Sequence, residues 1–278
     1  MTGPERDLVS QVAIVTGGGW NIGRAIALRL ARAGSRVVVA ARREGQLREV
    51  VSAIERQGGE ALAVPTDVTL LPEVERLVQR TLERFGTVDI LVACAGGGGA
   101  YAAVDAVRPE EWTGVVARNL FGTFHCARAV LPVLRAKNSG LLVTLAGGGA
   151  FFPLLGHQAT AYAAAKAAIC RFTDQLQAEL LDTAIRVNCV QPGMVWSPER
   201  LREVETEEAR TGRPHPERAH NRSPEDAAEL VHFLASAGGA RVRGRVIAVH
   251  DTWWRSPAAI RAIEQTIHLY RLRRVEEG

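Results

Sequence analysis

Residues 12–34 read VAIVTGGGWNIGRAIALRLARAG. The first part, Val12–Thr16, is apolar and rich in β-branched residues, a composition that favours a buried strand. From Asn21 to Ala33 apolar residues recur at helical spacing, and Gly34 follows directly, so this part predicts a helix that ends at a glycine. The stretch therefore predicts a strand, a glycine-rich turn and a helix in immediate succession.

The same alternation continues along the chain. Short β-branched runs are separated by longer amphipathic segments, which is typical of a parallel sheet covered by helices on both faces. The predicted strands are Val12–Thr16, Arg36–Ala40, Ala61–Pro65, Ile90–Cys94, Leu141–Leu145, Ile185–Val190 and Val246–Val249. The sequence predicts an α/β fold, a Rossmann-type doubly wound sheet of about seven parallel strands with helices on both faces.

Two segments interrupt this rhythm. Residues 196–221 are rich in charge and poor in apolar residues, which favours a mobile lid. Its arginines could bind an anionic substrate, or they could pair with the glutamates of the same segment. Near the C-terminus, Pro257–Tyr270 predicts an amphipathic helix that must bury one face on its own domain or on a neighbouring subunit. The stripe consists of Ile260, Ile263, Ile267 and Tyr270.

Adjacent tryptophans, Trp253 and Trp254, precede this predicted helix. We expect them to anchor it, and the alternative is an aromatic wall of a substrate pocket.

Composition bounds the kind of protein. The 278-residue chain has 47% hydrophobic and 23% charged residues, as in ordinary globular proteins. Its net charge of +4 includes no run of like charges, which argues against a nucleic-acid-binding face. No apolar stretch approaches the ~18 residues of a spanning helix, and polar residues 1–11 do not resemble a signal peptide. We therefore expect a cytoplasmic protein without a membrane or nucleic-acid partner.

The cysteines are widely spaced and lie in apolar segments. They are Cys94, Cys126, Cys170 and Cys189. This pattern predicts buried free thiols and neither a metal site nor a disulfide framework.

The turn at residues 16–23, TGGGWNIG, lies between the first strand and its helix. A pyrophosphate there could accept hydrogen bonds from free backbone N–H groups at the positive helix end, although a tight connection alone would also need glycines. The turn resembles the Thr-Gly-x-x-x-Gly-x-Gly motif of the short-chain dehydrogenase/reductase family, matched at Thr16, Gly17 and Gly23. Asn21 holds the place of the middle glycine, and asparagine tolerates a positive φ better than most residues.

Tyr162 and Lys166 are spaced i, i+4 on a predicted helix, which puts the phenol and the ammonium on one face. A cation beside a phenol favours phenolate, so we expect Lys166 to lower the tyrosine pKa from its usual value of about 10. The pair resembles the Tyr-x-x-x-Lys motif of the same family, and the resemblance implies that Tyr162 acts as acid or base. Residues 119–122, NLFG, resemble the family's Asn-x-x-Gly element. This implies that Asn119 holds a water that relays protons to Lys166, with structural hydrogen bonding as the alternative.

The serine that the family ordinarily places after the fifth strand is missing, because no Ser occurs between Gly140 and Tyr162. Losing one such oriented donor costs ~2.7–4 kcal/mol of transition-state stabilisation. His157 is our first candidate for a replacement donor and Gln158 the second, while Thr160 is a third polar residue of the loop. The alternative is that all three are solvated and that the glycine run 147–149 makes room for a bulky substrate.

Arg42 and Arg43 follow the second predicted strand. This segment contains no Asp or Glu that could bind a ribose 2′-hydroxyl. Arg42 could pair with a 2′-phosphate, which favours NADPH over NADH, or both arginines could face solvent. Asp67 and Val68 resemble the family's adenine-binding pair, although Asp67 could instead cap the next helix.

Two further segments complete the resemblance. Residues 93–96, ACAG, resemble the family's Asn-Asn-Ala-Gly, and residues 188–195, NCVQPGMV, resemble its Asn-x-x-x-Pro-Gly-x-Val. The latter implies that Val195 and Ser197 receive the nicotinamide carboxamide. In full, the resemblance implies a cofactor site made of Thr16, Gly17, Gly19, Trp20, Asn21, Ile22, Gly23, Arg42, Asp67, Val68, Ala95, Gly96, Tyr162, Lys166, Pro192, Gly193, Val195 and Ser197.

The resemblance runs from Val12 to Asp251. It implies a dinucleotide-binding and catalytic domain at residues 1–255, with 256–278 as a helical extension of the same domain. The expected function is NADPH-dependent carbonyl reduction, or the reverse alcohol oxidation, of a small molecule by a homodimer or homotetramer. The alternatives are an epimerase or dehydratase that uses the same tyrosine, and a catalytically impaired dinucleotide-binding sensor or scaffold.

Overall fold

The computed structural model describes residues 6–266, 270 and 271. Its centre is a seven-stranded parallel sheet in the order β3-β2-β1-β4-β5-β6-β7, which confirms the predicted doubly wound fold. The strands are β1 (Val12–Thr16), β2 (Arg36–Ala41), β3 (Ala61–Pro65), β4 (Ile90–Ala93), β5 (Gly140–Leu145), β6 (Ile185–Gln191) and β7 (Val246–Ala248). The strand order reverses between β1 and β4, and in such sheets a crevice opens at the carboxyl ends of these strands.

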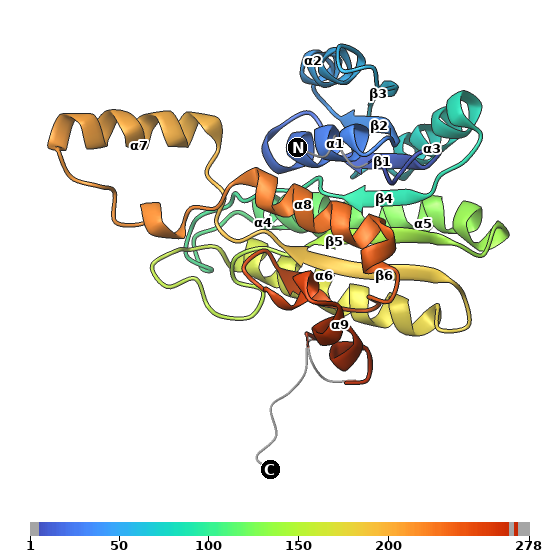
Figure 1. Ribbon diagram of the computed structural model, residues 1–278. Coiled ribbons are helices and arrows are strands. Elements are labelled where there is room, and N and C mark those ends of the chain that lie inside the picture. Colours follow the sequence, from blue (N-terminus) through green and yellow to red (C-terminus); the bar gives the residue numbers. More distant parts are fainter. Residues whose placement is uncertain (1–5, 267–269, 272–278) are drawn as a thin grey trace.

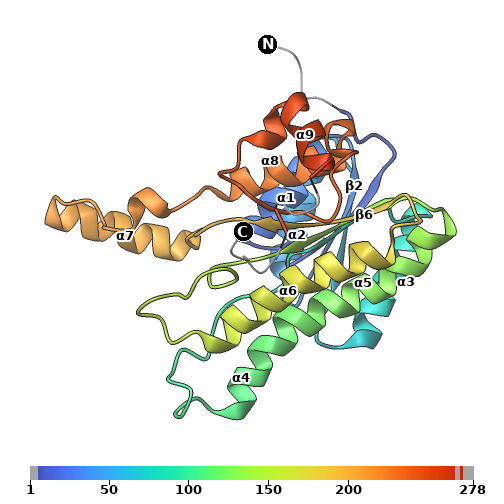
Figure 2. The ribbon, with the colours of Figure 1, turned by 90° about the horizontal axis from the view of Figure 1, so that it is seen from below.

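Helices cover both faces of the sheet (Figures 1 and 2). They are α1 (Asn21–Arg32), α2 (Glu44–Glu55), α3 (Leu71–Phe85), α4 (Pro109–Val116), α5 (Gly122–Ala136), α6 (Thr160–Glu179), α7 (Pro198–Thr211), α8 (Pro224–Ala235) and α9 (Pro257–Glu264). One core packs α1, α2, α8 and α9 against one face, and a second packs α3, α5 and α6 against the other.

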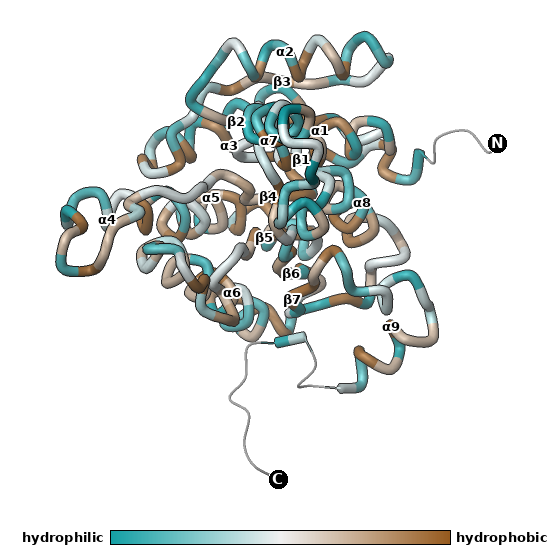
Figure 3. The backbone as a smooth tube through the Cα atoms, turned by 90° about the vertical axis from the view of Figure 1, so that its left-hand side faces the viewer, coloured by the Kyte–Doolittle hydropathy of each residue, from teal (hydrophilic) through white to brown (hydrophobic). Residues whose placement is uncertain are grey.

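Strand β1 shows how the two cores arise. Ala13 and Val15 belong to the first core, whereas Val12 and Ile14 belong to the second. Successive side chains of a strand point to opposite faces, so a strand buried on both sides must be apolar throughout. Hydrophobic and hydrophilic residues alternate along the helices instead, since each helix buries only one side (Figure 3).

A π-helical turn, Ala117–Phe121, joins α4 to α5 and contains the buried Asn119. Such turns are rare and often occur at functional sites. The helical spacing of the sequence did not predict this irregularity.

The C-terminal helix is shorter than predicted. Helix α9 ends at Glu264, and Tyr270 has a φ of 57°, so the prediction of a helix through Tyr270 is wrong. The physical reason is a competing hydrogen bond, because the backbone N–H of Val246 at the edge strand β7 donates to the Tyr270 carbonyl at 2.6 Å. Ile260 and Ile263 are buried as expected, and Ile267 lies outside the described residues.

The two tryptophans pack beneath this segment. Trp254 lies 5.1 Å from the Phe233 ring and Trp253 lies 5.0 Å from the Tyr270 ring, measured between ring centroids. Both are buried in the first core together with Ile260. The anchor interpretation of the tryptophans is therefore supported, and the pocket-wall alternative is not.

Residues 196–221, predicted as a lid, form an arm that extends away from the body (Figures 1 and 2). Helix α7 leads outward and the chain returns through a short 3₁₀ turn, Arg218–His220. At the base of the arm, Met194 and Asn221 form a parallel bridge, and the Arg222 N–H donates to the Met194 carbonyl at 2.7 Å.

Candidate active site

A cleft of about 630 Å³ opens at the carboxyl ends of the central strands. This volume is in the range of small-molecule and cofactor sites. The cleft brings together most of the predicted cofactor residues, namely Gly17, Gly19, Trp20, Asn21, Ile22, Gly23, Arg42, Asp67, Val68, Ala95, Gly96, Tyr162, Lys166 and Pro192. Segments more than a hundred residues apart in sequence therefore meet at one site.

The glycine turn fits a bound pyrophosphate. No side chain caps the first turn of α1, so its free N–H groups and positive end remain available to phosphate oxygens. A Cβ on Gly23 would overlap the Gly17 carbonyl, and one on Gly17 would lie 3.0 Å from the Ala95 backbone. Both glycines are therefore needed for the close packing of turn, helix and sheet.

Asn21, in place of the middle glycine, has a φ of 42°. Its amide Nδ2 donates a hydrogen bond to the Trp196 carbonyl at 3.3 Å. The side chain thus links the glycine turn to the first residue of the arm.

Arg42 and Arg43 line the end of the cleft near β2. Within the described part of the chain neither forms an ion pair. Asp67 also lines the cleft, and its Oδ1 accepts hydrogen bonds from the Thr69 N–H at 2.9 Å and hydroxyl at 2.8 Å. Burial alone would raise the pKa of Asp67, but these two bonds and the Arg42 charge hold it below its ordinary value. Asp67 therefore orders the turn before α3 and also faces the cleft.

Thr16 does not line the cleft. It is fully buried, and its Oγ1 accepts a hydrogen bond from the Ala95 N–H at 3.2 Å. Thr16 therefore joins the end of β1 to the Ala95-Gly96 segment after β4. It supports two residues that line the cleft without lining it itself.

Tyr162 and Lys166 meet near the floor of the cleft. The Lys166 Nζ donates to the Leu145 carbonyl at 2.9 Å and lies 5.6 Å from the centroid of the Tyr162 ring. A Cβ on Gly147 would overlap the Tyr162 hydroxyl oxygen and would lie 3.2 Å from the Lys166 Cε. The tyrosine hydroxyl therefore rests directly on the backbone at Gly147.

Asn119 is fully buried beside this pair. Its Nδ2 donates to the carbonyls of Gly97 at 2.9 Å and Val115 at 2.8 Å, and its Oδ1 accepts from the Gly97 N–H at 3.1 Å. A Cβ on Gly96 would lie 2.5 Å from the Asn119 Oδ1 and 3.7 Å from the Lys166 Nζ. The amide holds the loop after β4, and the water relay stays a prediction.

The electrostatics of the tyrosine differ from our expectation. Burial raises the pKa of Tyr162 to about 12, with smaller contributions from Tyr101 and Cys94. Burial also lowers the pKa of Lys166. The expectation that Lys166 lowers the tyrosine pKa is therefore wrong for the protein alone, because the cost of a buried phenolate outweighs the attraction of a cation that points toward Leu145.

Several predicted site residues do not reach the cleft. His157 and Gln158 are exposed loop residues, and the Thr160 Oγ1 accepts a hydrogen bond from the Trp112 indole at 3.2 Å. Ser197 caps α7 by accepting from the Arg200 N–H at 3.1 Å. Gly193, with a φ of 73°, and Val195 follow Pro192 but do not line the cleft.

The sequence patterns did not indicate some of the cleft residues after β4, on α4 and in the π-helical turn that follows it. Cys94, Gly97, Gly114 and Arg118 all line the cleft. The four-glycine run at residues 96–99 was the available signal, since such a run next to a predicted binding turn indicates close approach of other groups.

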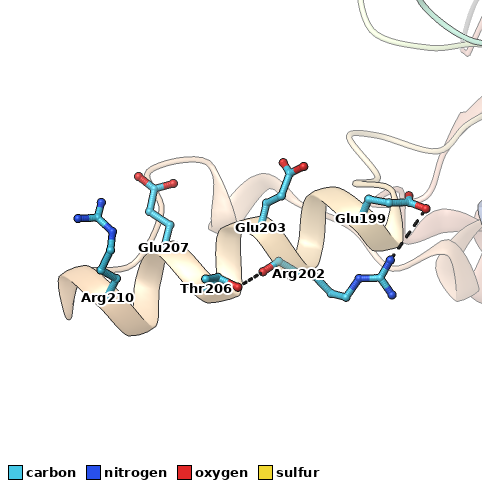
Figure 4. A pocket seen from close by; sticks show the side chains of 6 residues that line it. All are labelled: Glu199, Arg202, Glu203, Thr206, Glu207 and Arg210. Atoms are coloured by element: carbon cyan, nitrogen blue, oxygen red, sulfur yellow. Dashed lines mark hydrogen bonds and ion pairs between the residues drawn. The ribbon is translucent and has the colours of Figure 1, made fainter.

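The exposed face of α7 forms a second, shallow hollow outside the cleft (Figure 4). Ion pairs join Arg202 to Glu199 at 4.0 Å and Arg200 to Glu203 at 3.2 Å. Arg218 pairs with Glu208 at 2.6 Å. These contacts support the interpretation that the arm pairs most of its own charges.

All four cysteines are free thiols, and all but the half-buried Cys94 are buried, as expected. Within the described ranges, no cluster of His, Cys, Asp or Glu could hold a metal ion. Across the same described residues, no helix is long and apolar enough to cross a membrane.

Comparison with known proteins identifies the family. The profile of the short chain dehydrogenases matches residues 11–208. The chain belongs to the short-chain dehydrogenase family, whose members are oxidoreductases that use nicotinamide dinucleotides.

Named relatives are similar over most of their length. The chain is 37% identical over 255 residues to a Streptomyces coelicolor protein named "Putative ketoacyl reductase", which covers 86% of this chain and 95% of the relative. It is 35% identical over 188 residues to an uncharacterized oxidoreductase of Staphylococcus aureus, covering 68% of this chain and 79% of the relative.

Solved structures show the same fold. A variant of the actinorhodin polyketide ketoreductase with NADPH has a TM-score of 0.77 and 34% identity, covering 86% of this chain and 95% of that one. Levodione reductase has a TM-score of 0.78 and 28% identity, and the match covers 87% of this chain and 96% of the levodione reductase chain.

Proposed function

We propose that this protein reduces a carbonyl group of a small molecule with NADPH. The observation that carries the proposal is the meeting of Tyr162 and Lys166 in the cleft that also contains the glycine turn. Because burial raises the pKa of Tyr162 to about 12, the phenol holds its proton at neutral pH. A protonated phenol suits reduction, in which the substrate oxygen must gain a proton.

The chain's own residues then have distinct tasks. Tyr162 gives its phenolic proton to the substrate oxygen as that oxygen gains charge. The buried ammonium of Lys166 stabilises the resulting phenolate. A proton from solvent restores the phenol, and we propose that it arrives by way of Lys166 and Asn119. A reduced nicotinamide, when bound, supplies the hydride to the carbonyl carbon.

Arg42 supports NADPH as the cofactor. It lines the cleft beyond β2 and forms no ion pair among the described residues, although its charge reaches Asp67. A guanidinium pairs well with a phosphate. The similar ketoreductase structure with NADPH points the same way. By the family resemblance we also propose a homodimer or homotetramer.

The test is a titration of the purified protein with NADPH and NADH, followed by nicotinamide fluorescence. We expect NADPH to bind more tightly, and Arg42→Ala to weaken NADPH by about 10-fold or more, in keeping with the loss of a charge-assisted hydrogen bond. The affinity for NADH should change little, because NADH lacks the 2′-phosphate. Arg56→Ala, on the exposed end of α2, is the matched control.

Equal losses for both cofactors in Arg42→Ala would contradict the proposed contact. Binding of neither cofactor at millimolar concentration would contradict the proposed function and favour a non-redox role. Where binding is seen, consumption of NADPH with a panel of cyclic diketones and β-ketoesters completes the test.

A further inference from the structure

The cleft contains a positive charge that the proposed reaction does not use. Arg118 lines the cleft and is half-buried. It lies in the π-helical turn after α4, directly before the buried Asn119. Among the described residues Arg118 forms no ion pair. Partial burial of a charge without a counter-charge costs free energy, so this guanidinium is well suited to pair with an anion that enters the cleft.

Neutral backbone groups hold the guanidinium in place. Its Nη1 donates to the Gly114 carbonyl at 3.1 Å, and its Nη2 donates to the Gly98 carbonyl at 3.1 Å. Gly99 makes room for it, because a Cβ there would lie 2.7 Å from Nη2. A guanidinium has five N–H donors, so these two bonds leave three for a ligand. The group is therefore positioned without being neutralised.

The guanidinium lies in the same part of the cleft as Tyr162. Helix α4 lies beside the start of α6 (Figure 2), where the Trp112 indole donates to the Thr160 hydroxyl at 3.2 Å. Tyr162 follows two residues later on α6, and Gly114 follows Trp112 on α4. The hydrogen bond from Arg118 to Gly114 thus keeps the guanidinium against the helix that borders the reactive phenol.

The loop after β4 leads to the same conclusion. Its Gly98 carbonyl accepts from Arg118, and a Cβ on Gly96 would lie 3.7 Å from the Lys166 Nζ. Two residues of chain span at most about 7 Å. One small molecule can therefore contact the guanidinium while its carbonyl group lies at the Tyr162 and Lys166 pair.

The position of Arg118 does not suit the phosphates of the cofactor. Strand β1 separates β4 from β2, so the loop after β4 lies two strand spacings, about 10 Å, from the Arg42 end of the cleft. The glycine turn leads into α1 on one face of the sheet, whereas the π-helical turn leads into α5 on the other. Asp67, near Arg42, is the one acid among the described residues that line the cleft. The charge of Arg118 is therefore left for the substrate.

We propose that Arg118 is a specificity-determining residue, whose guanidinium binds a carboxylate that the substrate carries apart from the carbonyl being reduced. The planar fork of N–H groups in arginine matches the geometry of a carboxylate. This inference rests on the proposed carbonyl reduction and narrows its substrates to keto acids.

The test compares matched acids and esters as substrates, with NADPH as reductant. The probes are 3-oxocyclohexanecarboxylate, 4-oxocyclohexanecarboxylate and their methyl esters. We expect the wild-type protein to have a kcat/KM about 10-fold or more higher for an acid than for its ester. In Arg118→Gln the KM for the acid should rise about 10- to 100-fold, as expected for loss of a charge-assisted hydrogen bond. The kcat should change little, because the carboxylate is bound equally before and during the reaction.

Three comparisons separate substrate binding from a structural role of Arg118. The KM for the esters should change less than about threefold in Arg118→Gln, since glutamine can still donate to the loop. Arg118→Lys, which keeps the charge, should retain part of the preference for acids. Arg128→Gln removes an exposed arginine of α5 that does not line the cleft and should behave as the wild type. Equal losses for acids and esters in Arg118→Gln would show that Arg118 only holds the loop and would overturn the proposal.

Binding without turnover gives a second readout. Titration calorimetry of each acid into the protein saturated with NADP⁺ measures affinity, since no hydride is available for the ketone. The affinity for the acid should fall in Arg118→Gln by about as much as KM rises. The affinity for NADPH, measured by nicotinamide fluorescence, should stay within about twofold. A tenfold loss of NADPH affinity would assign the charge to the cofactor and would also overturn the proposal.

The outcomes distinguish this inference from the proposed function. If the wild-type protein reduces cyclic diketones or ketoesters but prefers neither acid to its ester, this inference alone is overturned. If it reduces none of the ketones, the proposed function fails, and this inference fails with it.

Discussion

Gly147 determines how deeply the Tyr162 phenol lies. Its missing side chain lets the Tyr162 hydroxyl rest on the backbone after β5, close to the Lys166 stem. The same closeness buries the hydroxyl and raises its pKa to about 12. A single glycine therefore favours the protonated form of the phenol that we propose as proton donor.

Restoring the family's missing serine at this residue should harm the protein. Gly147→Ser and Gly147→Ala both place a Cβ against the Tyr162 hydroxyl, so the ring must shift away from Lys166. We expect kcat to fall at least about 10-fold in both variants, because misplacement by about 1 Å can cost on the order of 10²-fold in rate. NADPH affinity should be preserved. Steady-state kinetics and cofactor titration measure the two effects.

Gly45→Ala is the matched control, since a Cβ there would meet nothing within 4 Å. A Gly147→Ser protein more active than the wild type would contradict this expectation. It would show that the Tyr162 ring can shift without loss of rate and that a serine hydroxyl at this position promotes the reaction.

At the residue scale, local spacing predicted what lies on one helix. Tyr162 and Lys166 share a face of α6 by their i, i+4 spacing, and the structure brings both to the cleft. Residues on loops could not be placed in the same way, because their directions depend on tertiary contacts. His157 is exposed outside the cleft lining, whereas Gly97, in a loop bent by positive φ values at Gly97, Gly99 and Ala100, does line the cleft.

At the scale of elements, the strands were predicted to within about one residue at each end. Strands buried on both faces must be apolar, so their composition marks their limits. The length of helix α9 was overestimated. Its end depends on the hydrogen bond between Val246 of β7 and Tyr270, two residues that are distant in sequence. The π-helical turn at Asn119 was likewise invisible, since one inserted residue leaves helical spacing nearly intact.

The link between α1 and the arm yields an element-scale prediction. Asn21→Ala loses the hydrogen bond to the Trp196 carbonyl and places alanine at a φ of 42°. We expect the melting temperature to fall by about 2–4 °C, the shift that ~1 kcal/mol of strain produces in a chain of this size. Trypsin should also cleave the arginine-rich arm faster. Differential scanning calorimetry and timed proteolysis measure these effects.

Asn21→Gly separates the two causes, because glycine loses the same bond without the backbone strain. Its melting temperature should stay near that of the wild type while its arm is cleaved faster. Cleavage at the wild-type rate in both variants would show that the bond does not restrain the arm.

For the whole molecule, buried thiols and a buried phenol should make the folded state less stable at alkaline pH. Burial raises the pKa of Cys94 to about 11, of Cys126 to about 12 and of Tyr162 to about 12. The unfolded chain loses these protons first as pH rises, from about pH 9 for thiols and about pH 10 for tyrosine. The contribution of these groups to the free energy of unfolding should therefore be constant below about pH 9. It should decrease as the pH rises toward 12.

Tyr162→Phe isolates one of these groups. Between pH 10 and pH 12 the wild type should lose about 2 kcal/mol more stability than the variant, which is most of the ~2.7 kcal/mol that a shift of about two pKa units represents. Urea unfolding at a series of pH values measures the difference. Parallel curves for the two proteins would mean that Tyr162 ionises as easily in the folded state as in the unfolded chain.

The arm at residues 196–221 is stabilised mainly from within. Val204 is buried inside it, Trp196 packs edge-on against His215, and Arg218 pairs with Glu208. Such a segment behaves as an exchangeable module. Its sequence could diverge, or be replaced by a relative's, while the sheet and the Tyr162 centre keep their geometry. The arm could thus be exchanged between related proteins without disturbing the rest of the fold.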